Sequence, residues 1–128
     1  MFNEIKTRED IEIFLDKTNA LHDGNILGVQ YANNGIYKIE HGHYFDFEKR
    51  KLVLQILVTS LWDAVVEIEF EGALEWQIKD DQMDITDTAV LLDENGWITW
   101  IDDVYISMEE AKKRSYVIAR SMRWRIVE

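Results

Sequence analysis

The segment Val65–Lys79, VVEIEFEGALEWQIK, constrains the fold most strongly because apolar and polar residues alternate along it. Successive side chains of a strand point to opposite faces, so this alternation predicts a strand with one face in a core and the other toward water. The expected inward residues are Val66, Ile68, Phe70, Leu74, Trp76 and Ile78, and the expected outward residues are Glu67, Glu69 and Glu71. A sheet with one polar face follows from this pattern.

Similar segments and turn signals on both sides predict further strands. These strands are expected at about residues 27–31, 36–43, 52–60, 83–92, 97–103 and 116–128. Asn95-Gly96 is typical of a tight hairpin turn, and ANNG at Ala32–Gly35 is interpreted as another. The segment LVLQILVTS is apolar on both sides, which predicts a strand in the middle of the sheet.

Two capping boxes predict helices before and after most of these strands. Thr7 with Asp10 marks the start of an amphipathic helix, and Ser107 with Glu110 marks a short helix before the last strand. The fold class is therefore expected to be α+β and mainly antiparallel β, as a curled sheet or a two-sheet sandwich of seven to eight strands. A chain of 128 residues is expected to form a single domain, residues 1–128.

Composition narrows the classes of function and location. The net charge of −11 argues against nucleic-acid binding, which requires clustered Lys and Arg to neutralise phosphates. The chain has no cysteine, which fits a reducing, cytoplasmic location and excludes a thiolate metal site. No apolar run approaches the roughly 18 residues of a membrane span, so no membrane association is expected. No cofactor-binding fingerprint occurs, and no cofactor is expected.

The negative charge is concentrated in one part of the chain. From Asp63 to Asp103 the sequence carries thirteen acidic residues and a single basic one, Lys79, while the rest of the chain is nearly neutral. One interpretation is a solvated outer face that discourages association of sheet edges. Another is a recognition surface for a basic protein. A third is neutralisation across the sheet by arginines of the last strand, namely Arg120, Arg123 and Arg125.

The recognition hypothesis assigns a partner-binding surface to acidic side chains together with aromatic side chains expected to be exposed. Its candidate residues are Glu67, Glu69, Glu71, Glu75, Asp80, Asp81, Asp84, Trp62 and Trp97. No sequence signature of a catalytic site accompanies them: the G-x-S-x-G, P-loop and H-E-x-x-H motifs are all absent. A non-enzymatic role is therefore favoured, with the oligomeric state left open.

Three histidines, His22, His41 and His43, carry the alternative hypothesis of a metal-dependent enzyme or ligand-binding domain. His41 and His43 share a face if they lie on a strand, and His22 can complete a metal site. His22 is also followed by Asp23 and Gly24. His22 and Asp23 can bond free backbone groups at a helix end, and Gly24 permits a turn, so the three residues fit a joint between helix and strand. The joint is favoured over a catalytic dyad because neighbouring strand residues point to opposite faces.

Three motifs carry a resemblance to known proteins. The chain resembles a group of small uncharacterised bacterial proteins with an FHD start in the order LHDGNILGVQY, then LVLQILV followed by VVEIEFEGALEWQI, then ITDTAVLLDENGWITWIDD. The likeness covers roughly residues 21–103, and the chain carries LHD in place of FHD. More loosely, the chain resembles small acidic immunity proteins encoded beside bacterial polymorphic toxins. This resemblance implies a non-enzymatic, immunity-like interaction module that neutralises a basic toxin, and it supplies no catalytic residues.

Overall fold

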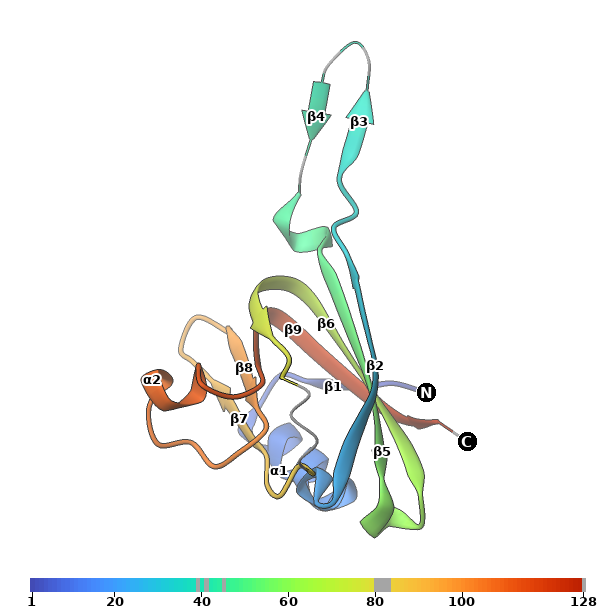
Figure 1. The fold of residues 1–128 in the computed structure, drawn as a ribbon. Helices are drawn as coiled ribbons and strands as arrows, with labels where there is room; N and C mark the ends of the chain where they lie inside the picture. Colours follow the sequence, from blue (N-terminus) through green and yellow to red (C-terminus); the bar gives the residue numbers. More distant parts are fainter. Residues whose placement is uncertain (39, 41, 45, 80–83, 128) are drawn as a thin grey trace.

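The computed structural model describes residues 1–38, 40, 42–44, 46–79 and 84–127. In this part of the chain the strands are β1 (Asn3–Ile5), β2 (Gly24–Ala32), β3 (Ile36–Lys38), β4 (Gly42–Tyr44), β5 (Lys51–Val58), β6 (Ala64–Gln77), β7 (Ala89–Leu92), β8 (Ile98–Ile101) and β9 (Tyr116–Val127). The α-helices are α1 (Arg8–Lys17) and α2 (Met108–Ala111), and the short 3-10 helices are η1 (Asn19–Leu21), η2 (Phe47–Lys49) and η3 (Thr59–Leu61). Figure 1 shows their arrangement.

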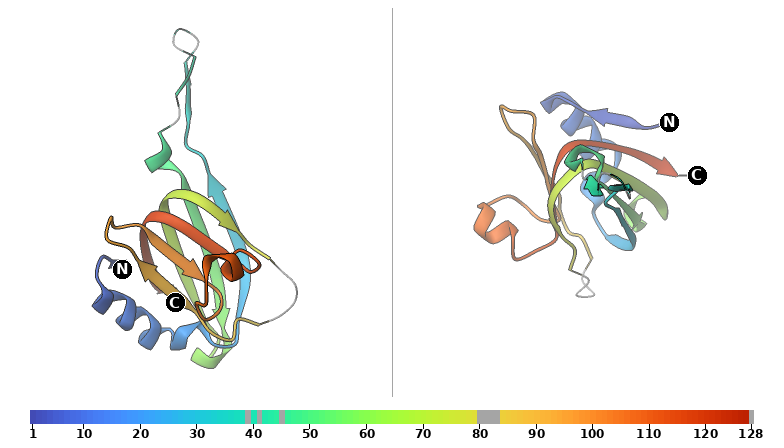
Figure 2. Two further views of the ribbon diagram at one scale, coloured as in Figure 1. Left: turned by 90° about the vertical axis from the view of Figure 1, so that its left-hand side faces the viewer. Right: turned by 90° about the horizontal axis from the view of Figure 1, so that it is seen from above.

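Seven strands form one antiparallel sheet in the order β2-β5-β6-β9-β8-β7, and β1 pairs with β9 beside β8. The sheet is strongly curled but does not close into a barrel (Figures 1 and 2). An N-terminal helix and a short helix before the last strand complete the architecture. The predicted fold class is thus confirmed, in its curled-sheet form.

Helix α1 covers the apolar face of this sheet. The Thr7 hydroxyl accepts a hydrogen bond from the Asp10 amide while the Asp10 carboxylate accepts one from the Thr7 amide, which confirms the capping box. Ile11 and Phe14 are buried on one side of the helix, and the Phe14 ring meets Trp124 of β9 edge to face at 5.4 Å. The apolar stripe of α1 therefore positions the helix against the sheet.

The centre of the sheet is formed by β6 and β9, whereas the apolar pattern of residues 52–60 predicts that strand there. Strand β5 is paired on both sides, but only β2 lies beyond it. The core-facing side chains of β5, Leu52, Leu54 and Ile56, are fully buried in the hydrophobic core. An apolar strand therefore marks a covered position, which need not be the central one.

Strand β6 changes its inward face at a bulge. Val66, Ile68 and Phe70 are fully buried as predicted, but after Gly72 the expected inward residues Leu74 and Trp76 are 53% and 36% exposed. Gly72 has a φ of 65°, and the register with β9 shifts between Ala73 and Glu75. One inserted residue exchanges the two faces of a strand, so the alternation beyond the bulge could not predict burial correctly.

The ANNG segment does not form the expected hairpin. Strand β2 pairs with β5, and the chain continues past Asn33–Gly35 into β3, which pairs with β4 as a separate ribbon. The ribbon projects from the end of the β2–β5 pair (Figures 1 and 2). Asn34 adopts a left-handed conformation and donates a hydrogen bond to the Lys49 carbonyl, so the segment holds the base of the ribbon.

The other hairpin signal is correct. The turn at Asp93–Gly96 joins β7 to β8, with Gly96 at a φ of 85° and the Asp93 amide bonded to the Trp97 carbonyl. Gly96 supplies the positive φ that this turn requires.

Candidate functional site: charged surfaces of the sheet

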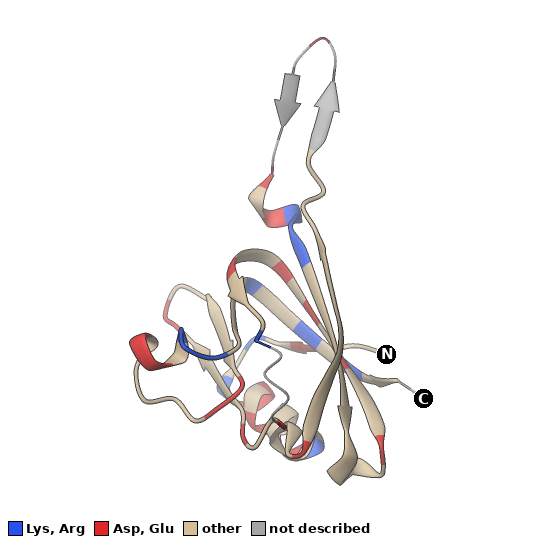
Figure 3. Cartoon of the chain, viewed as in Figure 1, with Lys and Arg blue, Asp and Glu red and all other residues tan. Residues whose placement is uncertain are grey.

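The glutamates of β6 lie on the face of the sheet opposite the core, where β9 places arginines beside them. Direct register pairs Glu67 with Arg125 and Glu69 with Arg123. The Arg125 guanidinium lies 3.0 Å from Glu67, and Arg123 makes a hydrogen-bonded ion pair with Glu69. Figure 3 shows these acidic positions of β6 alongside the basic positions of β9. Two of the predicted partner-binding residues are therefore neutralised within the sheet.

Further contacts extend this row of charges, which we call the ion-pair ladder (Lys51, Glu67, Glu69, Arg123 and Arg125). Lys51 of β5 lies 3.0 Å from the second oxygen of Glu69. The Phe2 ring covers the ladder from one side, with the guanidinium carbons of Arg123 and Arg125 at 4.1 and 4.4 Å from its centroid. The ladder is therefore neutralised and partly covered.

The ladder holds its carboxylates in the charged form. Burial of Glu69 acts to raise its pKa, but hydrogen bonds from Lys51 and Arg123 and their positive charges outweigh burial, so the pKa lies below its ordinary value. Glu67 and Glu69 are only 9% and 7% exposed. The expectation that these glutamates point freely into water is therefore wrong, because paired arginines remove them from solvent.

The remaining predicted residues of the sheet do not extend this surface. Glu71 is exposed at the end of the row, beside the bulge. Glu75 lies beyond the bulge, where hydrogen bonds from Tyr116 and Lys112 lower its pKa. Trp97 is half-buried between the Phe47 ring and the Arg120 guanidinium, which lies 5.0 Å from its centroid. Asp80 and Asp81 lie outside the described residues.

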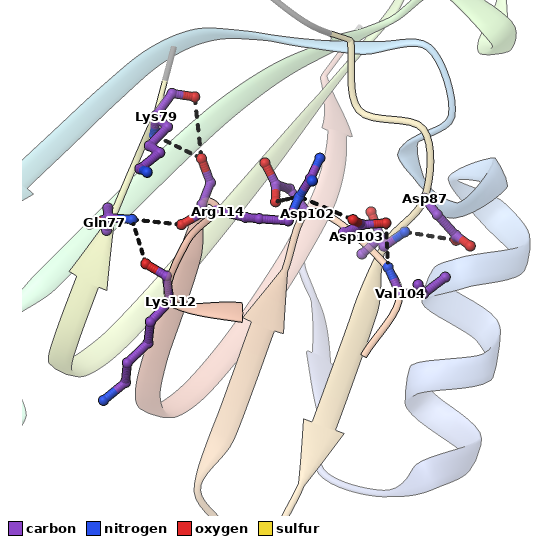
Figure 4. Close-up of polar contacts among 10 residues, drawn as sticks. Gln77, Lys79, Asp87, Asp102, Asp103, Val104, Lys112 and Arg114 are labelled. Carbon is purple, nitrogen blue, oxygen red and sulfur yellow. Dashed lines mark hydrogen bonds and ion pairs between the residues drawn. The ribbon is translucent and has the colours of Figure 1, made fainter. Parts of the chain in front are cut away.

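A second charged cluster joins the segment after β8 to the strands beside it (Figure 4). The Arg114 guanidinium lies 3.6 Å from Asp102 and 3.1 Å from Asp103. Burial raises the pKa of Asp102, although the charge of Arg114 and hydrogen bonds from Ser115 oppose it. Gln77 donates to the carbonyls of Lys112 and Arg114. These contacts fix the chain around α2, and we assign them a structural role.

The histidines are not brought together. His22 lies at the start of β2, whereas His43 lies in β4, beyond the far end of that strand (Figure 1). Nine residues of β2 at about 3.3 Å each separate them by roughly 30 Å, so they do not share a metal ion. His41 lies outside the described residues, and among those described no group of three metal-ligating side chains is close enough to hold an ion.

The segment containing His22 forms the expected joint between helix and strand. Asn19, Ala20 and Leu21 adopt left-handed conformations after α1, and Asp23 adopts another. The His22 ring contacts the Thr86 carbonyl through Nδ1 at 2.9 Å, and the His22 carbonyl accepts a hydrogen bond from the Ser60 hydroxyl. Because Ser60 does not bond to the imidazole, His22, Asp23 and Ser60 do not form a nucleophile, base and orienting group.

This joint belongs to a surface that we call the acidic end (Asp23, Trp62, Asp63, Asp84 and Asp87). Three segments meet there, since Gly24 pairs with Val58 of β5 and bridges to Ile85, while η3 turns the chain from β5 into β6. It lies at the end of the sheet remote from the β3–β4 ribbon (Figure 1). The three segments 18–26, 57–66 and 84–91 contain four aspartates and no Lys or Arg. Lys17, the last residue of α1, is the nearest basic residue along the chain to the first segment.

Trp62 is the exposed aromatic residue of the acidic end. It occupies the η3 turn with a φ of 56° and is 97% exposed. Asp63 follows it in the same left-handed conformation, and Asp84 is exposed on the neighbouring segment. Left-handed backbone at a residue with a large side chain is strained, and such strain is often retained at binding sites. The structure thus groups two predicted residues, Trp62 and Asp84, with others that were not predicted.

Sequence reasoning missed Asp23 and Asp63 as parts of a surface, and Lys51 and Phe2 as parts of the ladder. Asp63 directly follows Trp62, so their proximity could have been recognised. Asp23 and Asp84 are 61 positions apart, and only the Gly24–Ile85 bridge brings them together. Phe2 reaches the ladder because β1 pairs with β9, which no local pattern indicates.

Comparisons with known proteins assign no family to the chain. Searches with models of protein families, against curated proteins and against solved structures find no match. The resemblance to small bacterial proteins and immunity proteins therefore stays a prediction. In the described part of the chain, neither α-helix has the length and apolar character needed to cross a membrane.

Proposed function

We propose that this chain is a non-enzymatic interaction module that binds a basic protein through the acidic end, with Trp62 as the central contact. A toxin domain with a basic surface is the class of partner that the proposal names, in the manner of an immunity protein. The proposal keeps the basic partner expected from the sequence and moves its binding surface away from Glu67 and Glu69.

The exposure of Trp62 is the observation that carries the proposal. Trp100 and Trp124 are buried, Trp97 is stacked, and Trp76 contacts Tyr31, whereas Trp62 is almost fully exposed. Exposing an indole ring costs free energy in water, and tryptophan is enriched among the residues that dominate binding at protein interfaces. A tryptophan that is almost fully exposed therefore supports a contact with a partner.

The charge around Trp62 supports a basic partner. Asp23, Asp63 and Asp84 lie on the three segments that meet at this end, and among the described residues none of them has an ion pair to Lys or Arg. Aspartates without counter-charges attract a basic surface over the Debye length, roughly 8 Å at physiological salt, which raises the rate of association. An aromatic centre with a charged rim is the usual anatomy of a protein interface.

The test uses the proteins encoded by the genes on either side of the gene for this chain, and of these it takes the one with the more basic sequence. Trp62→Ala should weaken binding roughly 30-fold or more, as expected for a central interface residue. The double variant Asp63→Asn, Asp84→Asn should mainly slow association and reduce its dependence on salt. Surface plasmon resonance at two salt concentrations measures both effects.

Tyr105→Ala is the matched control, because Tyr105 is another exposed aromatic residue, at 46%, in a different loop. Unfolding by urea should show equal stability for Trp62→Ala and the unmodified chain. If the basic protein binds the unmodified chain and Trp62→Ala equally well, or binds neither, the proposed function is incorrect.

A further inference from the structure

We propose a second interaction surface: the free edge of β2, which pairs antiparallel with β2 of a second copy of this chain to form a two-fold symmetric dimer. The edge is distinct from the acidic end, and the inference does not depend on the proposed function.

The outer edge of β2 is open over most of its length. Strand β2 is the last strand on its side of the sheet, and it pairs with β5 on the other side. Among the described residues, only Gly24 meets another segment at this edge, through the bridge to Ile85. The amides and carbonyls that point outward from Gly28–Ala32 therefore have no strand beside them in the described part of the chain, and such groups are a template for another strand.

The regular part of the edge, Gly28–Ala32, also lacks charged residues and proline as protection against pairing. Edge strands of monomeric proteins commonly carry charged residues or proline, which prevent another strand from adding to the sheet. Strand β2 contains neither, and it lies in residues 24–37, the longest segment without Asp, Glu, Lys or Arg in a chain that is 30% charged. A bulge between Ile26 and Gly28 interrupts the lower part and leaves Gly28–Ala32 regular.

Apolar side chains accompany the open edge. Val29 and Tyr31 are opposite Leu54 and Leu52 of β5, so they share the core-facing side of the sheet, yet they are 38% and 41% exposed. The Tyr31 ring contacts Trp76 at 5.5 Å, and Trp76 is itself 36% exposed. This partly covered apolar row ends at the edge, where an added strand would extend the core.

Antiparallel pairing of two copies makes this row self-complementary. With Gln30 at the two-fold axis, Val29 of each copy lies opposite Tyr31 of the other, a pairing of β-branched and aromatic residues that stabilises sheets. Gly28 lies opposite Ala32, so no charged side chain of either strand enters the contact. A chain of net charge −11 is repelled by its own copies elsewhere, which makes an uncharged edge the favourable place for them to meet.

Charges beyond the strand favour the antiparallel direction. Asn34 follows the C-terminal end of β2 and donates a hydrogen bond to the carbonyl of the exposed Lys49. Asp23 and Asp84 lie at the N-terminal end of β2. In the two-fold arrangement Asn34 lies opposite Ile26 of the second copy, within about three residues, or roughly 10 Å, of its Asp23. This end of the edge carries both signs of charge, since Glu48 and Glu71 lie near Asn34 together with Lys49 and Lys51. The antiparallel arrangement thus brings Asp23 and Asp84 of one copy to a mixed surface of the other, whereas a parallel arrangement would place the aspartates of both copies together.

The experiment is light scattering on the full chain over a range of concentrations, combined with sedimentation equilibrium. The unmodified chain should reach twice the monomer mass. Val29→Lys should weaken dimerisation roughly ten-fold or more, because lysine at an edge disfavours pairing and its long side chain can reach solvent without unfolding the chain. Ile106→Lys is the matched control, since Ile106 is 73% exposed in a loop outside the sheet and should not affect the mass.

A hydrogen-exchange measurement on the unmodified chain keeps the test decisive if Val29→Lys does not fold. Amides of Gly28–Ala32 should exchange more slowly at high than at low protein concentration, while amides of the 102–107 loop should not change. The proposal is overturned if the unmodified chain is a monomer at all concentrations. It is also overturned if Val29→Lys and Ile106→Lys change the measured molecular mass equally. Trp62→Ala should leave the dimer intact, so this result is independent of partner binding at the acidic end.

Discussion

Removing the charge of Glu69 tests whether the ion-pair ladder stabilises the sheet. Glu69 is 7% exposed and accepts hydrogen bonds from Lys51 and Arg123. Glu69→Gln keeps the size of the side chain but leaves two cations without their carboxylate. A hydrogen bond to a charged group contributes about 1.5–3 kcal/mol when buried, and an exposed ion pair contributes about 0–1 kcal/mol.

The free energy contributed by the ladder should lie between the values for a buried charged hydrogen bond and for an exposed ion pair. The carboxylate of Glu69 is buried, whereas the side chains of Arg123 and Lys51 are 37% and 36% exposed. We therefore expect Glu69→Gln to lower the free energy of unfolding by about 2 kcal/mol, with a coupling energy to Arg123 of about 1–2 kcal/mol. Double-mutant cycles separate this coupling from the contact between Arg123 and Phe2, because the Phe2 contact is lost in both variants that lack Arg123.

Urea unfolding monitored by circular dichroism measures the four free energies for Glu69→Gln, Arg123→Met, the double variant and the unmodified chain. The control cycle uses Glu4 and Lys6, an exposed pair at 3.4 Å whose coupling should stay below about 0.5 kcal/mol. A coupling of Glu69 to Arg123 no larger than that of the control pair would refute the reasoning that burial strengthens the ladder.

Two further predictions concern the pH dependence and the bulge. The pKa of Glu69 is lowered in the folded chain, so its contribution to stability is present above the ordinary value of 4.5 and is lost as the pH falls through the folded pKa. Urea unfolding from pH 7 to pH 3 should therefore show a smaller loss of unfolding free energy for Glu69→Gln than for the unmodified chain. Equal losses would contradict the assignment. Gly72→Ala should destabilise the chain by about 1–3 kcal/mol, because φ is 65° and an added Cβ would lie 2.7 Å from Cγ of Arg120. Gly28→Ala, whose Cβ would meet only Gln55 at 3.7 Å, should change the unfolding free energy by less than about 1 kcal/mol, and similar effects of the two substitutions would show that the bulge conformation is unimportant.

The candidate surfaces were only partly predictable from local patterns. The alternation around Glu67 and Glu69 correctly placed both residues on the face opposite the core, and Arg123 and Arg125 were recognised as possible counter-charges. Whether those charges meet depends on register, since a shift by one residue moves every side chain to the other face. The pairing of β6 with β9 therefore determined that the carboxylates of the ladder have counter-charges, and the acidic end is formed by segments that are distant in sequence.

Local physical chemistry determined much of the secondary structure. The capping box of Thr7 and Asp10, the alternation up to Phe70 and the Asn95-Gly96 turn depend on interactions within a few residues, so the sequence alone was sufficient for them. Tertiary structure decided the rest: which strand β2 joins, where the bulge at Gly72 reverses the faces of β6, and which carboxylates remain without a counter-charge. These features depend on contacts between residues far apart along the chain, whose free energies are set by pairing and burial and leave no periodic signal in the sequence.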